Sequence, residues 1–194
     1  GSTVSADQAD NSRPVDTGKQ KRRTDVVEKS GDFQSSYDSQ SAGKSVGTVI
    51  PNNQLGPIRE ALLALESKVG NLDVFVKDKL GYPSTKQLYK AFSGEQIDAL
   101  ALGIHNNNNG KSLIIGDQTG VGKGRVGAGM LRYAMKEGMK PIFVTEKPAL
   151  FSDMFRDLND ISLEGEALPV PFIVNGADQK DARITDPRDK NKVF

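Results

Sequence analysis

The stretch SLIIGDQTGVGKGRVGAGMLRYA, residues 112–134, constrains the fold of this chain more than any other part of the sequence. An apolar run at Leu113–Gly116 predicts a buried strand, and the glycine-rich loop that follows it carries one lysine, Lys123. Beyond the loop, residues 123–137 have the periodicity of an amphipathic helix. Proteins cradle phosphate groups with a strand, a glycine-rich loop and a helix in this order. The stretch therefore predicts an α/β fold with a phosphate site.

The C-terminal half continues this alternation of strands and helices. PIFVT (residues 141–145) and PVPFIVN (residues 169–175) predict two further strands, and residues 148–160 predict the helix between them. Strands and helices in this order favour a parallel sheet with flanking helices. Three strands are too few for a complete doubly wound sheet, so we expect residues 93–194 to be the first part of a larger α/β domain.

The N-terminal half has a different composition. Residues 1–47 consist largely of Ser, Asp, Gln, Gly, Lys and Arg with few large apolar side chains, which predicts a disordered linker. Residues 48–92 predict a helical lead-in. Ser93 and Gln96 have the spacing of a capping box, which predicts the start of the next helix. Helices are expected at about residues 57–69, 72–80, 84–92 and 93–105.

Composition excludes several classes of site. The 194 residues include no cysteine and one histidine, His105, which excludes disulfides, cysteine nucleophiles and histidine metal clusters. The formal charge of +1 gives no global basic field, so any nucleic-acid contact must be local. No apolar run approaches the roughly 20 residues that span a bilayer, so no membrane partner is expected. The chain begins with Gly-Ser and no initiator Met, and we expect it to be a piece of a longer protein.

Two phosphate motifs overlap in the glycine-rich loop, and the first is a dinucleotide fingerprint. Gly122, Gly124 and Gly127 satisfy G-x-G-x-x-G, and Glu146 lies near the distance expected of an acid that binds the ribose of NAD. In that fold, however, the first glycine follows the strand almost at once. Here the five residues 117–121 intervene, which disfavours a dinucleotide site.

The second motif is the P-loop, G-x-x-x-x-G-K-[ST], whose backbone N–H groups wrap the phosphates while the lysine reaches the outer ones. Gly122 and Lys123 supply its G-K pair on a loop of the right length. Asp117 replaces the first glycine, and Gly124 replaces the Ser or Thr whose hydroxyl binds Mg²⁺. A third interpretation is a glycine-rich turn that only packs the helix close to the strand.

Two adjacent stretches, GDQTGVGKGRVGAGMLRYA and KPIFVTEKPALFSDMFRDLNDI, carry a resemblance to a known family. They resemble the opening of the strawberry notch family of superfamily 2 helicase-like NTPases. The likeness is closest to its bacterial and phage branch of very large polyvalent proteins, which often also carry a DNA methylase. G-K-G-R is the usual form of motif I in this family. The resemblance covers about residues 48–194 and implies a partial RecA-like P-loop NTPase domain that uses ATP and Mg²⁺.

The resemblance assigns a role to each residue of the loop. Lys123 would be the catalytic cation on the β- and γ-phosphates, with Arg125 as a second cation, and Thr119 would hydrogen-bond a phosphate. Gln96 stands where such enzymes place the glutamine that binds adenine, and its other interpretation is a helix-capping residue. Backbone N–H groups at the start of the helix would face the β-phosphate; they belong to Gly120, Val121, Gly122, Lys123 and Gly124.

Mg²⁺ lacks its usual protein ligands in this sequence. Asp117 is expected to orient a water on the ion, and the Asp-Glu pair of motif II, which normally binds it, does not follow residue 146. We therefore expect nucleotide binding that depends little on Mg²⁺, without turnover by this chain alone.

TEKPAL, after the second strand, stands where superfamily 2 proteins place motif Ia. Thr145 and Lys147 are therefore expected to grip a nucleic-acid phosphate, and helix capping is an equally good interpretation of them. The resemblance thus implies the ATP-binding portion of a helicase-like motor that works with helicase domains beyond residue 194. In a phage protein, the motor would protect injected DNA, lie beside other virion proteins, and act in the cytoplasm after packaging and injection. The alternative is a non-catalytic nucleotide-binding or structural module of a virion.

Overall fold

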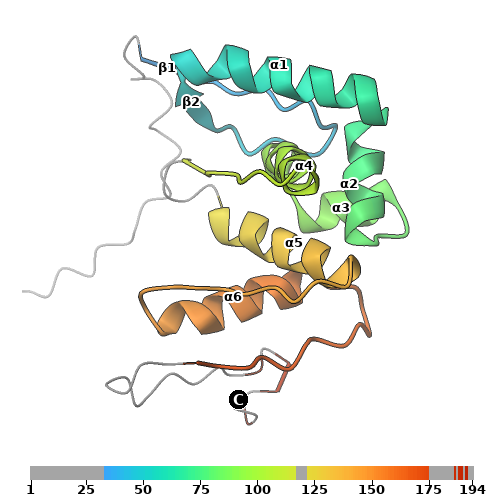
Figure 1. Ribbon diagram of the computed structural model, residues 1–194, viewed down its shortest axis with the longest axis vertical. Coiled ribbons are helices and arrows are strands. Elements are labelled where there is room, and N and C mark those ends of the chain that lie inside the picture. The colour runs from blue at the N-terminus through green and yellow to red at the C-terminus, as the bar shows by residue number, and fades with distance from the viewer. Residues whose placement is uncertain (1–32, 117–121, 175–185, 187, 190, 192–194) are drawn as a thin grey trace, which may run out of the picture. The chain divides into compact units, whose positions relative to one another are not determined.

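The computed structural model describes residues 33–116, 122–174, 186, 188–189 and 191 (Figure 1). The predictions for residues 1–32 and for Asp117, Thr119, Gly120 and Val121 fall outside this part of the chain. Within the described residues there are six helices and one pair of short strands. The helices are α1 (Asn52–Val69), α2 (Leu72–Leu80), α3 (Thr85–Ala91), α4 (Gly94–Asn108), α5 (Lys123–Lys136) and α6 (Ala149–Asp160).

The predicted helices are confirmed, and local capping explains where several of them begin. The side chain of Asn71 accepts the N–H of Val74 at the start of α2. At the start of α4, the hydroxyl of Ser93 accepts the N–H of Gln96, whose side-chain oxygen accepts the N–H of Ser93 in return. This is the predicted capping box, which satisfies two N–H groups that a helix end leaves without partners. Helix α1 begins earlier than predicted, at Asn52, and includes Pro57.

Helix α4 lies at the centre of the core, between α1 and α5 (Figure 1), and it also contacts α2. Its buried apolar residues are Ile97, Leu100, Ala101 and Ile104. Gly129 lets α5 approach α4 closely, because a Cβ there would lie 2.7 Å from a methyl group of Leu100. Residues 48–92 and 93–174 share this one core, so the predicted boundary between a helical lead-in and the NTPase part does not divide the structure.

The linker prediction is wrong for residues 33–47, which pack against the helices. Strand β1 (Gln34–Ser36) pairs antiparallel with β2 (Val49–Pro51), and the loop between them is held by buried carboxylates. The carboxylate of Asp98 on α4 accepts hydrogen bonds from the hydroxyl of Tyr37 (2.8 Å) and from the backbone N–H groups of residues 40 and 41 (2.7 and 2.9 Å). Composition did not reveal this order, because it comes from polar contacts to carboxylates far away in the sequence together with the burial of Tyr37.

The parallel sheet expected from residues 113–116, 141–145 and 169–175 is not seen among the described residues, where these segments are extended but unpaired. Their side chains nevertheless alternate as those of strands do. Ile115 and Ile173 pack against the core, and the ring of Phe143 packs edge-on against that of Phe151. The residues between them are exposed, up to 93 % for Phe172; they are Ile114, Ile142, Val144, Val170, Phe172 and Val174. Parallel sheets are stable when both of their faces are buried. In these three segments, one row of apolar side chains is exposed to solvent.

We predict that Asp98→Ala lowers the free energy of unfolding by about 2–4 kcal/mol, because it leaves the donors that converge on a buried carboxylate without an acceptor. Urea denaturation measures the change. Asp38→Ala, which removes an exposed carboxylate from the same loop, is the matched control and should change stability by less than about 0.5 kcal/mol. Equal effects of the two substitutions would contradict the role assigned to Asp98.

Candidate functional site

The N-terminus of α5 has the features of an anion site. Gly122 is the N-cap residue, with φ 79° and ψ 39°, a left-handed conformation that glycine adopts without strain. As a glycine, Gly122 has no side chain with which to cap the helix. Because the first N–H groups of a helix have no intrahelical acceptor and the helix dipole is positive there, such an end attracts anions. The structure thus places Lys123 at the first helical position, beside the loop predicted to hold phosphates.

Gln96 lies against this helix end, although 26 residues separate it from Gly122. Its side-chain nitrogen donates a hydrogen bond to the carbonyl oxygen of Gly122 (3.4 Å). A Cβ on Gly122 would lie 2.5 Å from that nitrogen, so a larger residue here would have to displace the side-chain amide of Gln96. The structure therefore brings Gln96 to the start of α5. The role of Gln96 in binding adenine stays a prediction, and its side-chain oxygen serves the capping box of α4.

Gly124 meets a carboxylate that the sequence analysis did not single out. A Cβ on Gly124 would overlap with Oδ2 of Asp157 on α6, well inside the 3.0 Å that real Cβ atoms keep. Only the missing hydroxyl at position 124 hinted that another group fills this space. The contact itself depends on how α5 and α6 pack, so no local pattern identifies Asp157.

Arg125 holds neighbouring elements together. Its guanidinium donates to the carbonyl oxygen of Ala91 at the end of α3 (3.2 Å) and pairs with Asp160 of α6 (3.1 Å). A second cation on the phosphates would require this side chain to leave Asp160. That role of Arg125 stays a prediction.

With this geometry in view, comparison with known families decides between the overlapping motifs. Residues 70–188 match the family described as P-loop containing NTP hydrolase pore-1. The chain belongs to this family. No curated protein matches the chain, and no solved structure matches it. Membership of a P-loop NTP hydrolase family favours nucleotide binding by Gly122 and Lys123 and disfavours the dinucleotide interpretation of Gly124, Gly127 and Glu146.

The residues predicted to contact nucleic acid lie just before α6. The hydroxyl oxygen of Thr145 accepts the backbone N–H of Lys147 (3.4 Å), a local turn in which the lysine side chain is exposed. This bond lies before α6, whose N-cap residue is Pro148 and has no side-chain cap, so it is a local turn and not a helix cap; the side chain of Lys147 is accessible. A contact of these two residues with nucleic acid stays a prediction.

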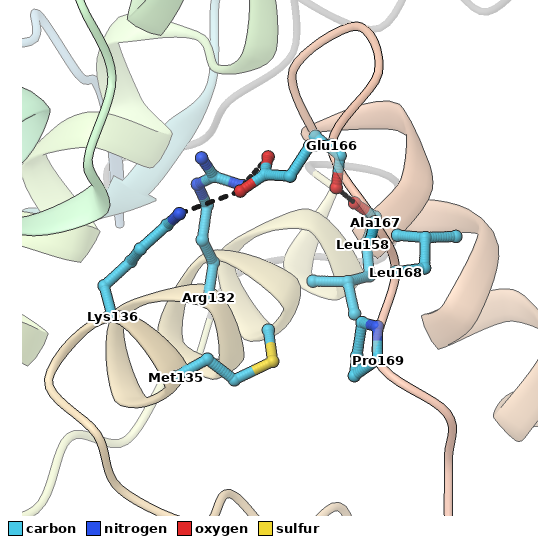
Figure 2. Close-up of a pocket in the computed structure, with 9 residues that line it drawn as sticks. Arg132, Met135, Lys136, Leu158, Glu166, Ala167, Leu168 and Pro169 are labelled. Carbon is cyan, nitrogen blue, oxygen red and sulfur yellow. Dashed lines mark hydrogen bonds and ion pairs between the residues drawn. The ribbon is translucent and has the colours of Figure 1, made fainter.

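A cavity of about 340 Å³ lies between α5 and residues 158–169 (Figure 2). At one end, Arg132 and Lys136 reach from α5 to the carboxylate of Glu166, at 2.6 and 2.8 Å. Burial raises the pKa of Glu166, but hydrogen bonds from Arg132 and Lys136 outweigh it and lower the pKa to about 2. Arg132 also stacks on the ring of Tyr82, 4.6 Å from its centroid.

These bonds tie α5 to the chain after α6. Arg132 lies ten residues beyond Gly122, which is about 15 Å along the helix. The cavity is therefore separate from the helix end that would hold phosphates.

Two negative findings concern the described residues only. They include no group of three His, Asp or Glu side chains that could hold a metal ion. Among the helices in the described part of the chain, none is both long and apolar enough to cross a membrane.

We predict that Gly122→Ala costs more stability than Gly165→Ala. Both glycines have positive φ, which costs about 1–2 kcal/mol for alanine, but a Cβ meets Gln96 only at Gly122. Unfolding free energies of the two variants, each also made with Gln96→Ala, isolate the contact. The excess cost at Gly122 should disappear in the Gln96→Ala background. An excess that persists without Gln96 would show that this side chain does not position the loop.

Proposed function

We propose that this chain is the nucleotide-binding portion of a helicase-like NTPase that acts on nucleic acid. The observation that carries the proposal is the start of α5 at Gly122 and Lys123, which Gln96 contacts, in a member of a P-loop NTP hydrolase family. The NTP hydrolase part rests on that membership. The helicase part rests on the resemblance of residues 112–160 to the strawberry notch family.

The chain's own residues bind the nucleotide through its phosphates. Backbone N–H groups at the start of α5 donate to phosphate oxygens, and the helix dipole favours their negative charge. Lys123 adds a full positive charge at the same end of the helix. Gly122 begins α5 in a left-handed conformation that glycine adopts without strain, and Lys123 follows it at the first helical position, so these residues fit a nucleotide. Bound Mg²⁺ would neutralise phosphate charge in this site.

The proposed nucleic-acid partner would contact Thr145 and Lys147 at the start of α6, where the lysine is exposed. The exposed apolar residues Ile114, Val144 and Phe172 support a further partner. Large apolar side chains that alternate along extended segments are typical of a sheet face that another domain buries. We propose that the remaining helicase domains bury this face. In a phage or mobile-element protein, this motor would protect incoming DNA in the cytoplasm, after packaging in a virion with other proteins.

A non-catalytic module is the second candidate. The start of α5 would serve this module as well, because binding through backbone N–H groups and Lys123 does not require turnover. An intact Asp-Glu pair of motif II in the parent protein would favour the motor, and its loss would favour the module.

We predict that Lys123→Ala weakens ADP and ATP binding at least several-fold, because a charge-assisted phosphate contact is typically worth about 1.5–3 kcal/mol. Calorimetry on the full 194-residue chain measures the affinities. Lys140→Ala, which removes an exposed lysine beyond the end of α5, is the matched control and should bind as the unmodified chain does. Unchanged affinity in Lys123→Ala would refute the assigned role, and tighter binding of NAD than of ADP would restore the dinucleotide interpretation.

A further inference from the structure

Position 124 is where a P-loop normally carries the Ser or Thr whose hydroxyl binds Mg²⁺. In this chain it is Gly124, and the direction in which its side chain would point leads to Oδ2 of Asp157. A hydroxyl oxygen on residue 124 would lie one covalent bond beyond the Cβ, in the space that Asp157 occupies. The carboxylate oxygen thus stands close to where the missing hydroxyl oxygen would be.

We propose that Asp157 replaces the P-loop hydroxyl and is the side chain through which this chain binds the Mg²⁺ that accompanies the nucleotide. The inference rests on the proposed nucleotide site at the start of α5. Mg²⁺ prefers oxygen ligands, and it is commonly bound by one or two carboxylates together with phosphate oxygens and waters. A single protein carboxylate therefore suffices, which agrees with the absence of a three-ligand cluster among the described residues.

Charge supports this role for Asp157. A carboxylate beside the helix end that holds phosphates would repel them unless a cation lies between the two groups. Two arginines lie near enough to act on Asp157, but Arg125 pairs with Asp160 and Arg156 pairs with Asp153. Within the described residues, the side-chain carboxylate of Asp157 accepts no hydrogen bond and forms no ion pair, although its backbone carbonyl accepts the N–H of Ile161.

The surroundings of Asp157 point the same way. Burial raises the pKa of its carboxyl, with smaller opposing effects from Arg125 and Arg156, because water solvates the charged form poorly there. A divalent cation next to the carboxylate would offset that cost. Gly124 is also explained, since any larger residue at this position would displace the carboxylate.

This inference revises the sequence-based expectation that Mg²⁺ changes affinity little. That expectation considered the loop and Asp117, whereas Asp157 lies 33 residues after Gly124 on another helix. A Cβ at position 124 would displace the carboxylate of Asp157, so the site as proposed requires glycine there.

Calorimetry with ADP on the full chain, in Mg²⁺ and in EDTA, tests the proposal. We expect Mg²⁺ to tighten ADP binding by about tenfold or more in the unmodified chain, and Asp157→Asn to abolish the increase. In EDTA, Asp157→Asn should bind ADP as tightly as the unmodified chain or more tightly, because a repulsive charge is gone. Asp153→Asn removes a carboxylate one turn earlier on α6 and should keep the full effect of Mg²⁺.

The outcomes separate this inference from the proposed function. If ADP binds through Lys123 but Asp157→Asn keeps the full effect of Mg²⁺, or if the unmodified chain shows no such effect, the role of Asp157 is refuted and the nucleotide site stands. If ADP does not bind in either condition, the proposed function fails and the inference fails with it. Circular dichroism shows whether each variant is folded. Gly124→Ala gives an independent reading, because its Cβ would displace the carboxylate of Asp157 without supplying a hydroxyl, and it should lose the effect of Mg²⁺ as well.

Discussion

The burial of α4 between the N-terminal helices and α5 is the constraint on which the rest of the structure depends. Its apolar side chains fill the core, and Gly129 of α5 allows the close approach that this packing needs. The same helix carries Asp98, which orders the loop before α1, and Gln96, which contacts Gly122. One buried helix therefore contacts the polar N-terminal loop through Asp98 and the start of α5 through Gln96.

How far the sequence predicts this fold depends on the range of the interactions involved. Helical periodicity and the Ser93 cap are local, and the helices were correctly predicted from them. The order of residues 33–47 comes from carboxylates that lie 30 to 60 residues away in the sequence, such as Asp98, and composition cannot reveal them. Alternation at Ile114 and Ile115 identifies an extended segment with one buried face, but pairing between strands requires neighbours that alternation does not supply.

The residues of the candidate site also differ in whether a local sequence pattern can identify them. Gly122 and Lys123 are identifiable from the glycine-rich motif, because phosphate loops need flexible backbone and a nearby cation within a short stretch. Asp157 is not identifiable, since only the packing of α6 on α5 brings its carboxylate to Gly124. Arg125 shows the opposite case, in which a residue next to the motif has structural partners, Ala91 and Asp160, that the motif does not predict.

The central claim is that the start of α5 binds nucleotide phosphates, and amide hydrogen exchange with and without ADP tests it most directly. If the claim is right, ADP slows exchange at the amides of residues 122–125, while α2 on the far side of the core is unchanged. No change at residues 122–125 would contradict the claim. So would protection confined to the cavity beside Arg132 and Glu166, because the ligand would then bind away from this helix end.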